Sequence, residues 1–244
     1  DGLAAGKGVL VTESIEEARD AVRSNLSGAA FGGAGRRVVI EEGLTGPELS
    51  LLVLCDGKVV MPLPPAQDFK RVGDGDEGPN TGGMGAYSPV PLVGQGVVDE
   101  VMATAVEPTL EELQARGIDY RGVLYAGIML TPTGPKVLEY NVRFGDPECQ
   151  ALVPRLASDL AVHCREAAEG ALRTEVAWRP DACVTVVLAS EGYPAAPRVG
   201  DPIEGLAAAS MIDGVVVFHA GTRREGDAVV TSGGRVLAVT GVGG

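Results

Sequence analysis

The sequence is poor in basic side chains and contains no long hydrophobic run. It has 20 Lys and Arg against 33 Asp and Glu, which gives a formal net charge of -13. A general nucleic-acid surface needs clustered basic side chains, so we expect no nucleic-acid partner. No apolar run approaches the ~18 residues of a membrane-spanning helix, and no signal peptide precedes the first predicted element. These absences predict a cytoplasmic protein without a membrane segment.

Cysteine and histidine are scarce, and neither is arranged as a metal or redox site. None of the four cysteines forms a Cys-x-x-Cys pair, which argues against a zinc site and a disulfide framework. The two histidines, His163 and His219, are far apart in the sequence, and we expect both to be structural. The sequence shows no Ser-His-Asp or Cys-His arrangement.

The composition is that of a globular α/β protein with one or two domains. Hydrophobic residues make up 45% and charged residues 22% of the chain, and short apolar stretches are separated by glycine. Helical and strand patterns mix up to about residue 175, after which short strands dominate. We therefore predict an α/β (α+β) domain over residues 1–175 and a small β-rich domain over residues 176–244.

The predicted elements follow from periodicity and turn residues. Residues 64–91 are rich in Gly and Pro and are predicted to form one long functional loop. A helix interrupted at Pro108 is predicted over residues 99–116. The remaining predictions are helices over 14–25 and 158–172 and strands over 9–12, 37–41, 48–54, 59–63, 124–131, 135–143, 182–190, 215–220, 228–231 and 235–240.

One strand carries the most informative motif, Lys-Val-Leu-Glu-Tyr-Asn-Val-Arg-Phe-Gly-Asp-Pro-Glu over residues 136–148. Strand alternation puts Glu139, Asn141 and Arg143 on one face. Two oxygen ligands on a rigid strand suit Mg²⁺, and an arginine beside them can hold a phosphate. The alternative is an amphipathic strand with a solvated polar face. The turn at the end of the strand favours a site.

Two weaker motifs also suit a nucleotide. The glycine-rich segment 2–8 could wrap a phosphate with its backbone N–H groups while Lys7 supplies charge, although a flexible hairpin turn is the alternative. It is not a Walker A sequence, because no Ser or Thr follows Lys7. Residues 39–48 are predicted to include a buried strand that runs into acidic residues, although charged strand ends are ordinary. Backbone groups there could read an adenine edge while a carboxylate holds the ribose.

A glycine-rich loop, an acidic strand end and a Glu-x-Asn-x-Arg motif follow one another along the sequence. With these motifs in this order, the sequence resembles the ATP-grasp ligases. Within them it resembles the glycinamide ribonucleotide synthetases, or phosphoribosylamine-glycine ligases. The resemblance rests on residues 65–71, 78–87, 124–127, 141–148, 218–222 and 233–237 and covers nearly the whole chain.

The resemblance implies an ATP-grasp fold with antiparallel sheets and flanking helices, followed by a small β-rich domain. It implies a ligase that joins glycine to 5-phosphoribosylamine through a glycyl phosphate, giving glycinamide ribonucleotide, ADP and phosphate in purine synthesis. The implied cofactors are ATP and Mg²⁺, with Mn²⁺ as an alternative ion. The partners are then small molecules, and we expect a monomer or a weak homo-oligomer.

The resemblance also assigns residues to the donor side of the reaction. Glu139 and Asn141 are the implied metal ligands, and Arg143 is implied to hold the γ-phosphate. Glu48 is implied to meet the ribose. The other implied ATP-binding residues are Gly6, Lys7 and Gly8 at the triphosphate and Glu41, Glu42, Gly43 and Leu44 at the adenine.

For the acceptor substrates the assignment stays open. Asp68 or Asp146 could orient the attacking amine. Lys70 and Arg235 either reach the ribose phosphate or are surface charges. The candidates for contact with glycine and the amine are Thr81, Gly82, Gly83, Met84 and Gly85, together with the turn 146–148.

Both ends of the sequence read as parts of larger domains. We therefore expect a fragment that lacks an amino-terminal domain and the carboxy-terminal end. Two other functions remain open: another ATP-grasp carboxylate-amine ligase, and a nucleotide-binding fragment without turnover. A P-loop kinase is disfavoured by the missing Ser or Thr after Lys7.

Overall fold

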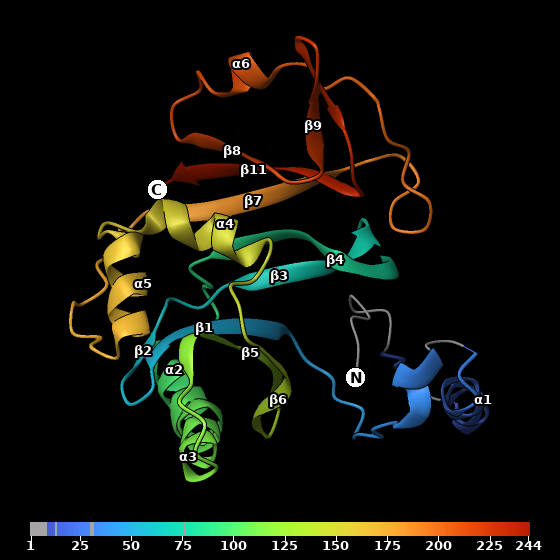
Figure 1. Cartoon of the computed structure of the whole chain (residues 1–244), viewed down its shortest axis with the longest axis vertical. Coiled ribbons are helices and arrows are strands. Elements are labelled where there is room, and N and C mark those ends of the chain that lie inside the picture. Colours follow the sequence, from blue (N-terminus) through green and yellow to red (C-terminus); the bar gives the residue numbers. More distant parts are fainter. Residues whose placement is uncertain (1–8, 13, 30–31, 76) are drawn as a thin grey trace.

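Two antiparallel sheets make up most of the computed structural model, which describes residues 9–12, 14–29, 32–75 and 77–244 (Figure 1). The first sheet has the order β2-β1-β5-β6. Its strands are β1 (Glu48–Asp56), β2 (Val60–Pro62), β5 (Arg121–Thr131) and β6 (Gly134–Asn141). The second sheet has the order β3-β4-β7-β11-β8. Its strands are β3 (Gln67–Gly73), β4 (Glu77–Ser88), β7 (Ala182–Ala189), β11 (Arg235–Gly243) and β8 (Val215–His219).

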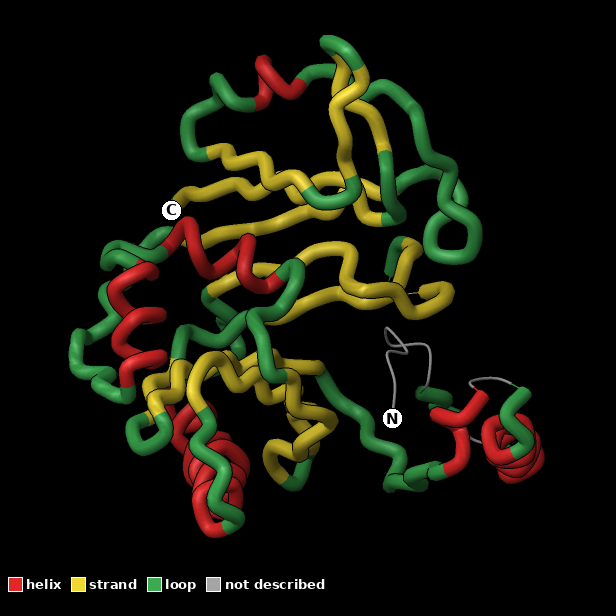
Figure 2. Tube along the Cα trace, in the orientation of Figure 1, coloured by secondary structure: helices red, strands yellow, loops and turns green. Residues whose placement is uncertain are grey.

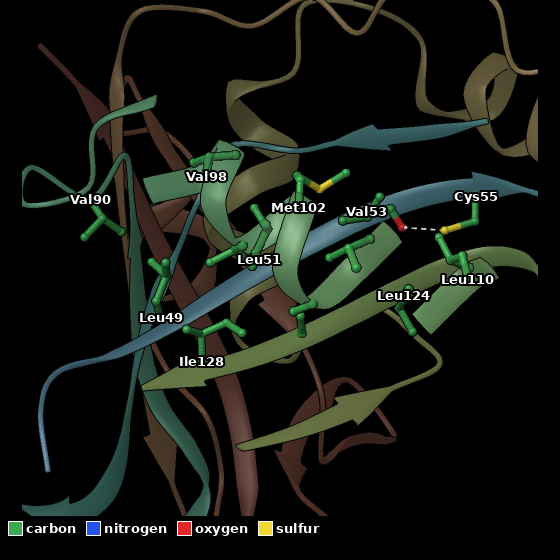
Figure 3. Packing of buried hydrophobic residues seen from close by; sticks show 14 residues of the cluster. Leu49, Leu51, Val53, Cys55, Val90, Val98, Met102, Leu110, Leu124 and Ile128 are labelled. Carbon is green, nitrogen blue, oxygen red and sulfur yellow. Dashed lines mark hydrogen bonds between the residues drawn. The ribbon is translucent and has the colours of Figure 1, made fainter. Parts of the chain in front are cut away.

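Strand alternation in β1 divides the residues around the first sheet into two clusters. Leu49, Leu51 and Val53 are fully buried and pack against α2 (Gln95–Val101) and α3 (Glu107–Ala115), as Figure 3 shows. Leu52 and Leu54 point to the other face and pack with residues from α5 (Leu160–Glu169). Because successive side chains of a strand alternate, Ser50 and Glu48 share this second face. The candidate site is built on it.

The predicted helix at 99–116 is longer and less regular than the sequence suggests. It begins at Gln95 and passes through a π-helical turn over Met102–Val106 before α3 begins. Pro108 does not break it; it lies in the first turn of α3, directly after the π-helical turn. The predicted end at Gly117 is confirmed by the positive φ of 76° there.

The prediction of one long loop over residues 64–91 is wrong. This segment contains β3 and β4, which pair with each other, and β4 also pairs with β7. Glycine lowers strand propensity, but here it allows close packing, since a Cβ on Gly85 would lie 2.7 Å from the backbone oxygen of Thr185. The pairing with β7, 95 or more positions later in the sequence, stabilises strands that local propensity disfavours.

Three of the C-terminal strands, β7, β8 and β11, belong to this second sheet. β7 pairs with β4 on one side and with β11 on the other, so the sheet crosses the predicted boundary between residues 175 and 176. The predicted strands over 182–190, 215–220 and 235–240 are confirmed. The sequence reasoning missed β9 (Thr222–Glu225), which forms a small ribbon with β10 (Ala228–Thr231).

The segment that precedes β1 carries α1 (Ile15–Leu26), which lies apart from both sheets in Figures 1 and 2. The predicted strands over 9–12 and 37–41 are wrong, because these described residues belong to no sheet. Val39 and Ile40 are 74% and 82% exposed, so they lack the neighbouring strand that would bury them. The other helices are α4 (Glu148–Leu152) and α6 (Leu206–Ala209), with 3-10 turns at Gly32–Arg36 and Val153–Arg155.

No helix in the described part of the chain combines the length and hydrophobicity needed to cross a membrane.

Candidate active site

The polar side chains at the end of β6 lie on one face, as strand alternation predicts. Glu139 and Asn141 are opposite Gly127 and Tyr125 of β5. The Asn141 amide Nδ2 donates to Glu139 Oε1 at 3.1 Å, and Arg143 Nη2 donates to Asn141 Oδ1 at 3.4 Å. The hydroxyl of Tyr140 points the other way and donates to the Ala105 carbonyl at 3.0 Å.

This arrangement fits a hard divalent cation. Glu139 supplies carboxylate oxygens and Asn141 an amide oxygen, which are the donors that Mg²⁺ prefers. Two side chains leave the other octahedral positions to water and phosphate oxygens. The Arg143 guanidinium lies beside these donors and is exposed, so it can meet an anion bound there.

An ion pair that joins the two sheets lies close to this face. Lys70 of β3 donates to the Glu48 carboxylate of β1. Burial acts to lower the pKa of Lys70, but the carboxylates of Asp68, Glu48 and Glu139 outweigh it and the pKa is raised. Lys70 is therefore a firmly charged cation between the two sheets.

Asp68 and Glu148 form a second acidic group next to the ion pair. The Glu148 carboxylate is only 2% exposed and accepts hydrogen bonds from Ser50 Oγ at 3.1 Å and the Tyr125 hydroxyl at 2.6 Å. Burial raises the pKa of Asp68 to about 7, and the charge of Glu148 adds to the rise, while Lys70 opposes it. Asp68 can therefore gain or lose a proton near neutral pH.

The predicted acceptor loop forms part of β4. Thr81 Oγ1 donates to the Lys70 carbonyl at 2.7 Å and accepts from the Gly83 N–H at 3.0 Å. Gly83 has a φ of 111°, a left-handed conformation that favours glycine. Of the other candidates in this loop, Gly82 is exposed, Met84 is half-buried and Gly85 is buried.

Arg235, predicted as a phosphate contact or a surface charge, lies at this loop and at the predicted turn. Its Nη2 is 3.1 Å from Asp146 Oδ2, and its side chain is 23% exposed. Its Nη1 donates to the carbonyls of Gly82 and Asp146, each at 2.7 Å. Arg235 is therefore not a free surface charge.

The predicted adenine segment lies beside the β5–β6 turn of the first sheet. Glu41, Glu42 and Gly43 are exposed, and Leu44 is half-buried. Glu42, Gly43 and Leu44 line one side of a hollow of about 250 Å³, and the β5–β6 turn lines the other. The predicted phosphate-binding residues Gly6, Lys7 and Gly8 lie outside the described residues.

Sequence reasoning missed three side chains that build this site, Ser50, Tyr125 and Tyr193. Ser50 and Tyr125 hold Glu148, and they share their face with Glu48 and Glu139, so strand alternation could have located them. Glu148 itself was predicted only as part of a turn. The hydroxyl of Tyr193 accepts a hydrogen bond from the Gly82 N–H at 3.1 Å, and no local sequence signal points to it.

The fold and the polar strand face define an ATP-grasp protein. A solved structure of biotin carboxylase from Campylobacter jejuni covers 96% of this chain and 50% of its own with a TM-score of 0.67, although only 14% of the residues are identical. That likeness shows the fold alone.

The family is shown by sequence. The model of the phosphoribosylglycinamide synthetase ATP-grasp (A) domain matches residues 1–149, and that of the C domain matches residues 183–244. The chain belongs to the phosphoribosylglycinamide synthetase family.

Named relatives agree with this assignment. A phosphoribosylamine--glycine ligase from Vibrio cholerae is 54% identical over 245 residues, which is 100% of this chain and 57% of the relative. One from Streptomyces coelicolor is 53% identical over 247 residues and again covers 100% and 57%. The crystal structure of the Thermotoga maritima phosphoribosylamine--glycine ligase has a TM-score of 0.85 at 38% identity and covers 100% of this chain and 60% of its own. The chain therefore spans somewhat more than half the length of these relatives.

Proposed function

We propose that this chain is part of an ATP-dependent ligase that joins glycine to 5-phosphoribosylamine. The observation that carries the proposal is the polar face of β6, where Glu139, Asn141 and Arg143 contact one another close to the Lys70–Glu48 ion pair. In a member of this family, such a face suits phosphoryl transfer from ATP. The names of the curated relatives supply the substrates.

The proposed reaction has two steps. A carboxylate oxygen of glycine attacks the γ-phosphorus of ATP, the bond to the bridging oxygen of ADP breaks, and glycyl phosphate forms. The amine of 5-phosphoribosylamine then attacks the glycyl carbonyl carbon, phosphate leaves, and the nitrogen loses a proton. Neither step needs a protein nucleophile, so alignment and charge stabilisation are the tasks of the protein.

Glu139 and Asn141 are the proposed ligands of Mg²⁺, or of Mn²⁺ in its place. The bound ion would neutralise charge on the phosphate oxygens. Arg143 would hold the transferred phosphoryl group through its planar fork of donors. Its exposure and its contact with Asn141 support this role.

Other residues are proposed to bind the nucleotide. Glu48 would accept from the ribose hydroxyls, and Lys70, which is paired with Glu48, would add positive charge near the phosphates. The segment from Glu41 to Leu44 would contact the adenine; the exposure of Glu41, Glu42 and Gly43 supports this role. Gly6, Lys7 and Gly8 would close over the triphosphate.

The acceptor substrates are proposed to bind at the loop from Thr81 to Gly85. Of the two carboxylates that the sequence left open, Asp68 is the better acceptor for the proton of the attacking amine. Its pKa is raised to about 7, first by burial and then by Glu148. Asp146 is paired with Arg235 and accepts from Gln150 at 2.7 Å, so we assign it a supporting role.

The test is ADP release from Mg-ATP, measured alone, with glycine, and with glycine plus 5-phosphoribosylamine generated in the same tube. It is run on this chain and on a chimera in which this chain replaces the matching part of the Streptomyces coelicolor relative. Turnover of the chimera that requires both acceptors supports the proposal. Turnover with a different carboxylic acid favours another ATP-grasp ligase, and nucleotide binding without turnover in both proteins favours a binding role.

A further inference from the structure

Both backbone groups of Gly82 are bound by side chains from the C-terminal part of the chain. The Gly82 N–H donates to the Tyr193 hydroxyl at 3.1 Å, and its carbonyl accepts from Arg235 Nη1 at 2.7 Å. Tyr193 is 111 residues away in the sequence and Arg235 is 153 residues away. These two contacts fix the orientation of a peptide in the loop that we propose for the acceptor substrates.

The same arginine also holds the turn after β6. Its Nη1 donates to the Asp146 carbonyl at 2.7 Å, and its Nη2 donates to Asp146 Oδ2 at 3.1 Å. Loop and turn are in direct contact, because a Cβ on Gly83 would lie 2.5 Å from Pro147 Cδ. A guanidinium has five donors in a rigid plane, so one side chain can hold two segments at a fixed spacing.

The side chains that hold Gly82 are themselves braced. Ser190 donates from its N–H to the Gly234 carbonyl at 2.8 Å and from its Oγ to the Gly233 carbonyl at 2.7 Å. A Cβ on Gly234 would lie 2.4 Å from Tyr193 Cδ2, so the tyrosine ring packs closely against the Gly234 backbone. Supports of this kind keep the groups that contact a substrate in place.

A shift of this loop would also displace residues on the ATP-binding side of the site. The loop continues through Thr81, whose Oγ1 bonds the Gly83 N–H and the Lys70 carbonyl. Lys70 in turn pairs with Glu48. The turn leads directly to Glu148, which lies two residues after Asp146 and beside Asp68. Arg235 and Tyr193 contact the loop directly, whereas they reach Lys70 and Glu48 only through Thr81. Loss of either side chain should therefore disturb the loop more than the donor side.

We infer that Arg235 and Tyr193 are positioning residues that hold the loop 81–85 and the turn 146–148 in the geometry that the acceptor substrates require. This inference rests on the proposed function, since that function identifies the loop as the acceptor site. Neither residue needs to touch a substrate. Their loss should therefore impair use of glycine and the amine far more than binding of Mg-ATP.

The test uses the chimera with the substitutions Arg235→Gln, Arg235→Lys and Tyr193→Phe. Arg223→Gln is the matched control, because Arg223 lies on β9 and its guanidinium pairs with Glu225 of the same strand. Three quantities are measured: amide hydrogen exchange over residues 80–85 and 145–149, the Kd of Mg-ATP, and kcat/KM for glycine and for 5-phosphoribosylamine.

For Arg235→Gln we expect faster exchange in both segments and a loss of about 100-fold in kcat/KM for the acceptors, the scale of a 1 Å misplacement, with the Kd of Mg-ATP within about twofold. Tyr193→Phe should show a smaller loss in the same direction. Arg235→Lys should resemble Arg235→Gln, because a single ammonium cannot replace the fork. Arg223→Gln should match the parent chimera.

Two results would show that Arg235 contacts an anionic substrate directly and would overturn the inference. One is unchanged amide hydrogen exchange in Arg235→Gln together with a lower kcat/KM. The other is a kcat/KM in Arg235→Lys close to that of the parent chimera. Parent kinetics in Arg235→Gln would overturn it too. Failure of the proposed function is a different result, since the parent chimera would then release no ADP in response to glycine.

Discussion

The Tyr125 hydroxyl donates a hydrogen bond of 2.6 Å to the carboxylate of Glu148, which is almost fully buried. Ser50 Oγ donates to the same oxygen at 3.1 Å. A buried carboxylate is costly unless donors satisfy it, so these two hydroxyls offset the cost of burying Glu148 beside Asp68. The pair Tyr125 and Glu148 thus connects β5 of the first sheet to the start of α4.

Replacing Tyr125 with Phe should destabilise the chain. The substitution removes the shorter of the two donors to a buried charged group, and a loss of about 1–3 kcal/mol in the free energy of unfolding is expected. Tyr120→Phe is the matched control, because the Tyr120 hydroxyl donates to a neutral carbonyl, that of Val123, at 2.6 Å. Urea unfolding of both variants measures the difference. A loss for Tyr125→Phe no larger than that for Tyr120→Phe would contradict the importance of this contact.

Asp68 should titrate near neutral pH in the protein without nucleotide or metal. Burial and the charge of Glu148 raise its pKa to about 7, so the carboxyl carbon resonance of Asp68 should have its midpoint there. Replacing Glu148 with Gln removes a negative charge and should lower that midpoint. A midpoint near 4 in the unmodified chain would show that Asp68 is solvated, and Asp68 would then be a poor proton acceptor.

The same shift predicts how stability depends on pH. Between the ordinary pKa of an aspartate, about 4, and the folded value near 7, Asp68 is protonated more in the folded than in the unfolded chain. Its contribution to the free energy of unfolding therefore falls as pH rises through this window. Asp68→Asn should remove this slope. The measurement is the urea midpoint at several pH values from 4 to 8, and identical slopes in the two proteins would refute the assignment.

Glu139→Gln should weaken divalent metal binding. The substitution removes one negative ligand of the proposed pair, so we expect at least a 10-fold higher Kd for Mn²⁺ in the presence of ADP, measured by electron paramagnetic resonance. Glu111→Gln on α3 is the control, since Glu111 lies on the helix that packs against the opposite face of the sheet. Equal Mn²⁺ affinities for the two variants would remove Glu139 from the metal site.

Arg143→Lys should impair turnover more than ATP binding. Lysine keeps the charge but loses the planar fork, so a group that acts on the transferred phosphate should lose about 100-fold or more in kcat. The Kd of Mg-ATP should change much less. Arg224→Lys on the exposed β9 ribbon is the control. Equal losses in kcat and in ATP affinity would place Arg143 in ground-state binding instead.

Local sequence patterns predicted the hairpin of β5 and β6 and the shared face of Glu139 and Asn141, because strand alternation has a fixed period. They failed for β3 and β4, where glycines lower propensity and pairing with β7 decides the structure. They also left Arg235 undecided. Its partner Asp146 is 89 residues away, and no periodicity encodes a contact at that separation.

The most direct test of the proposed function follows oxygen from glycine. The chimera is supplied with Mg-ATP, 5-phosphoribosylamine and glycine labelled with ¹⁸O in its carboxylate, and the released phosphate is analysed by mass spectrometry. Formation of glycyl phosphate followed by attack of the amine transfers one labelled oxygen to each phosphate, which is the result we expect. Phosphate without label, released at the rate of ADP formation, would show hydrolysis by water and contradict glycine activation by this site.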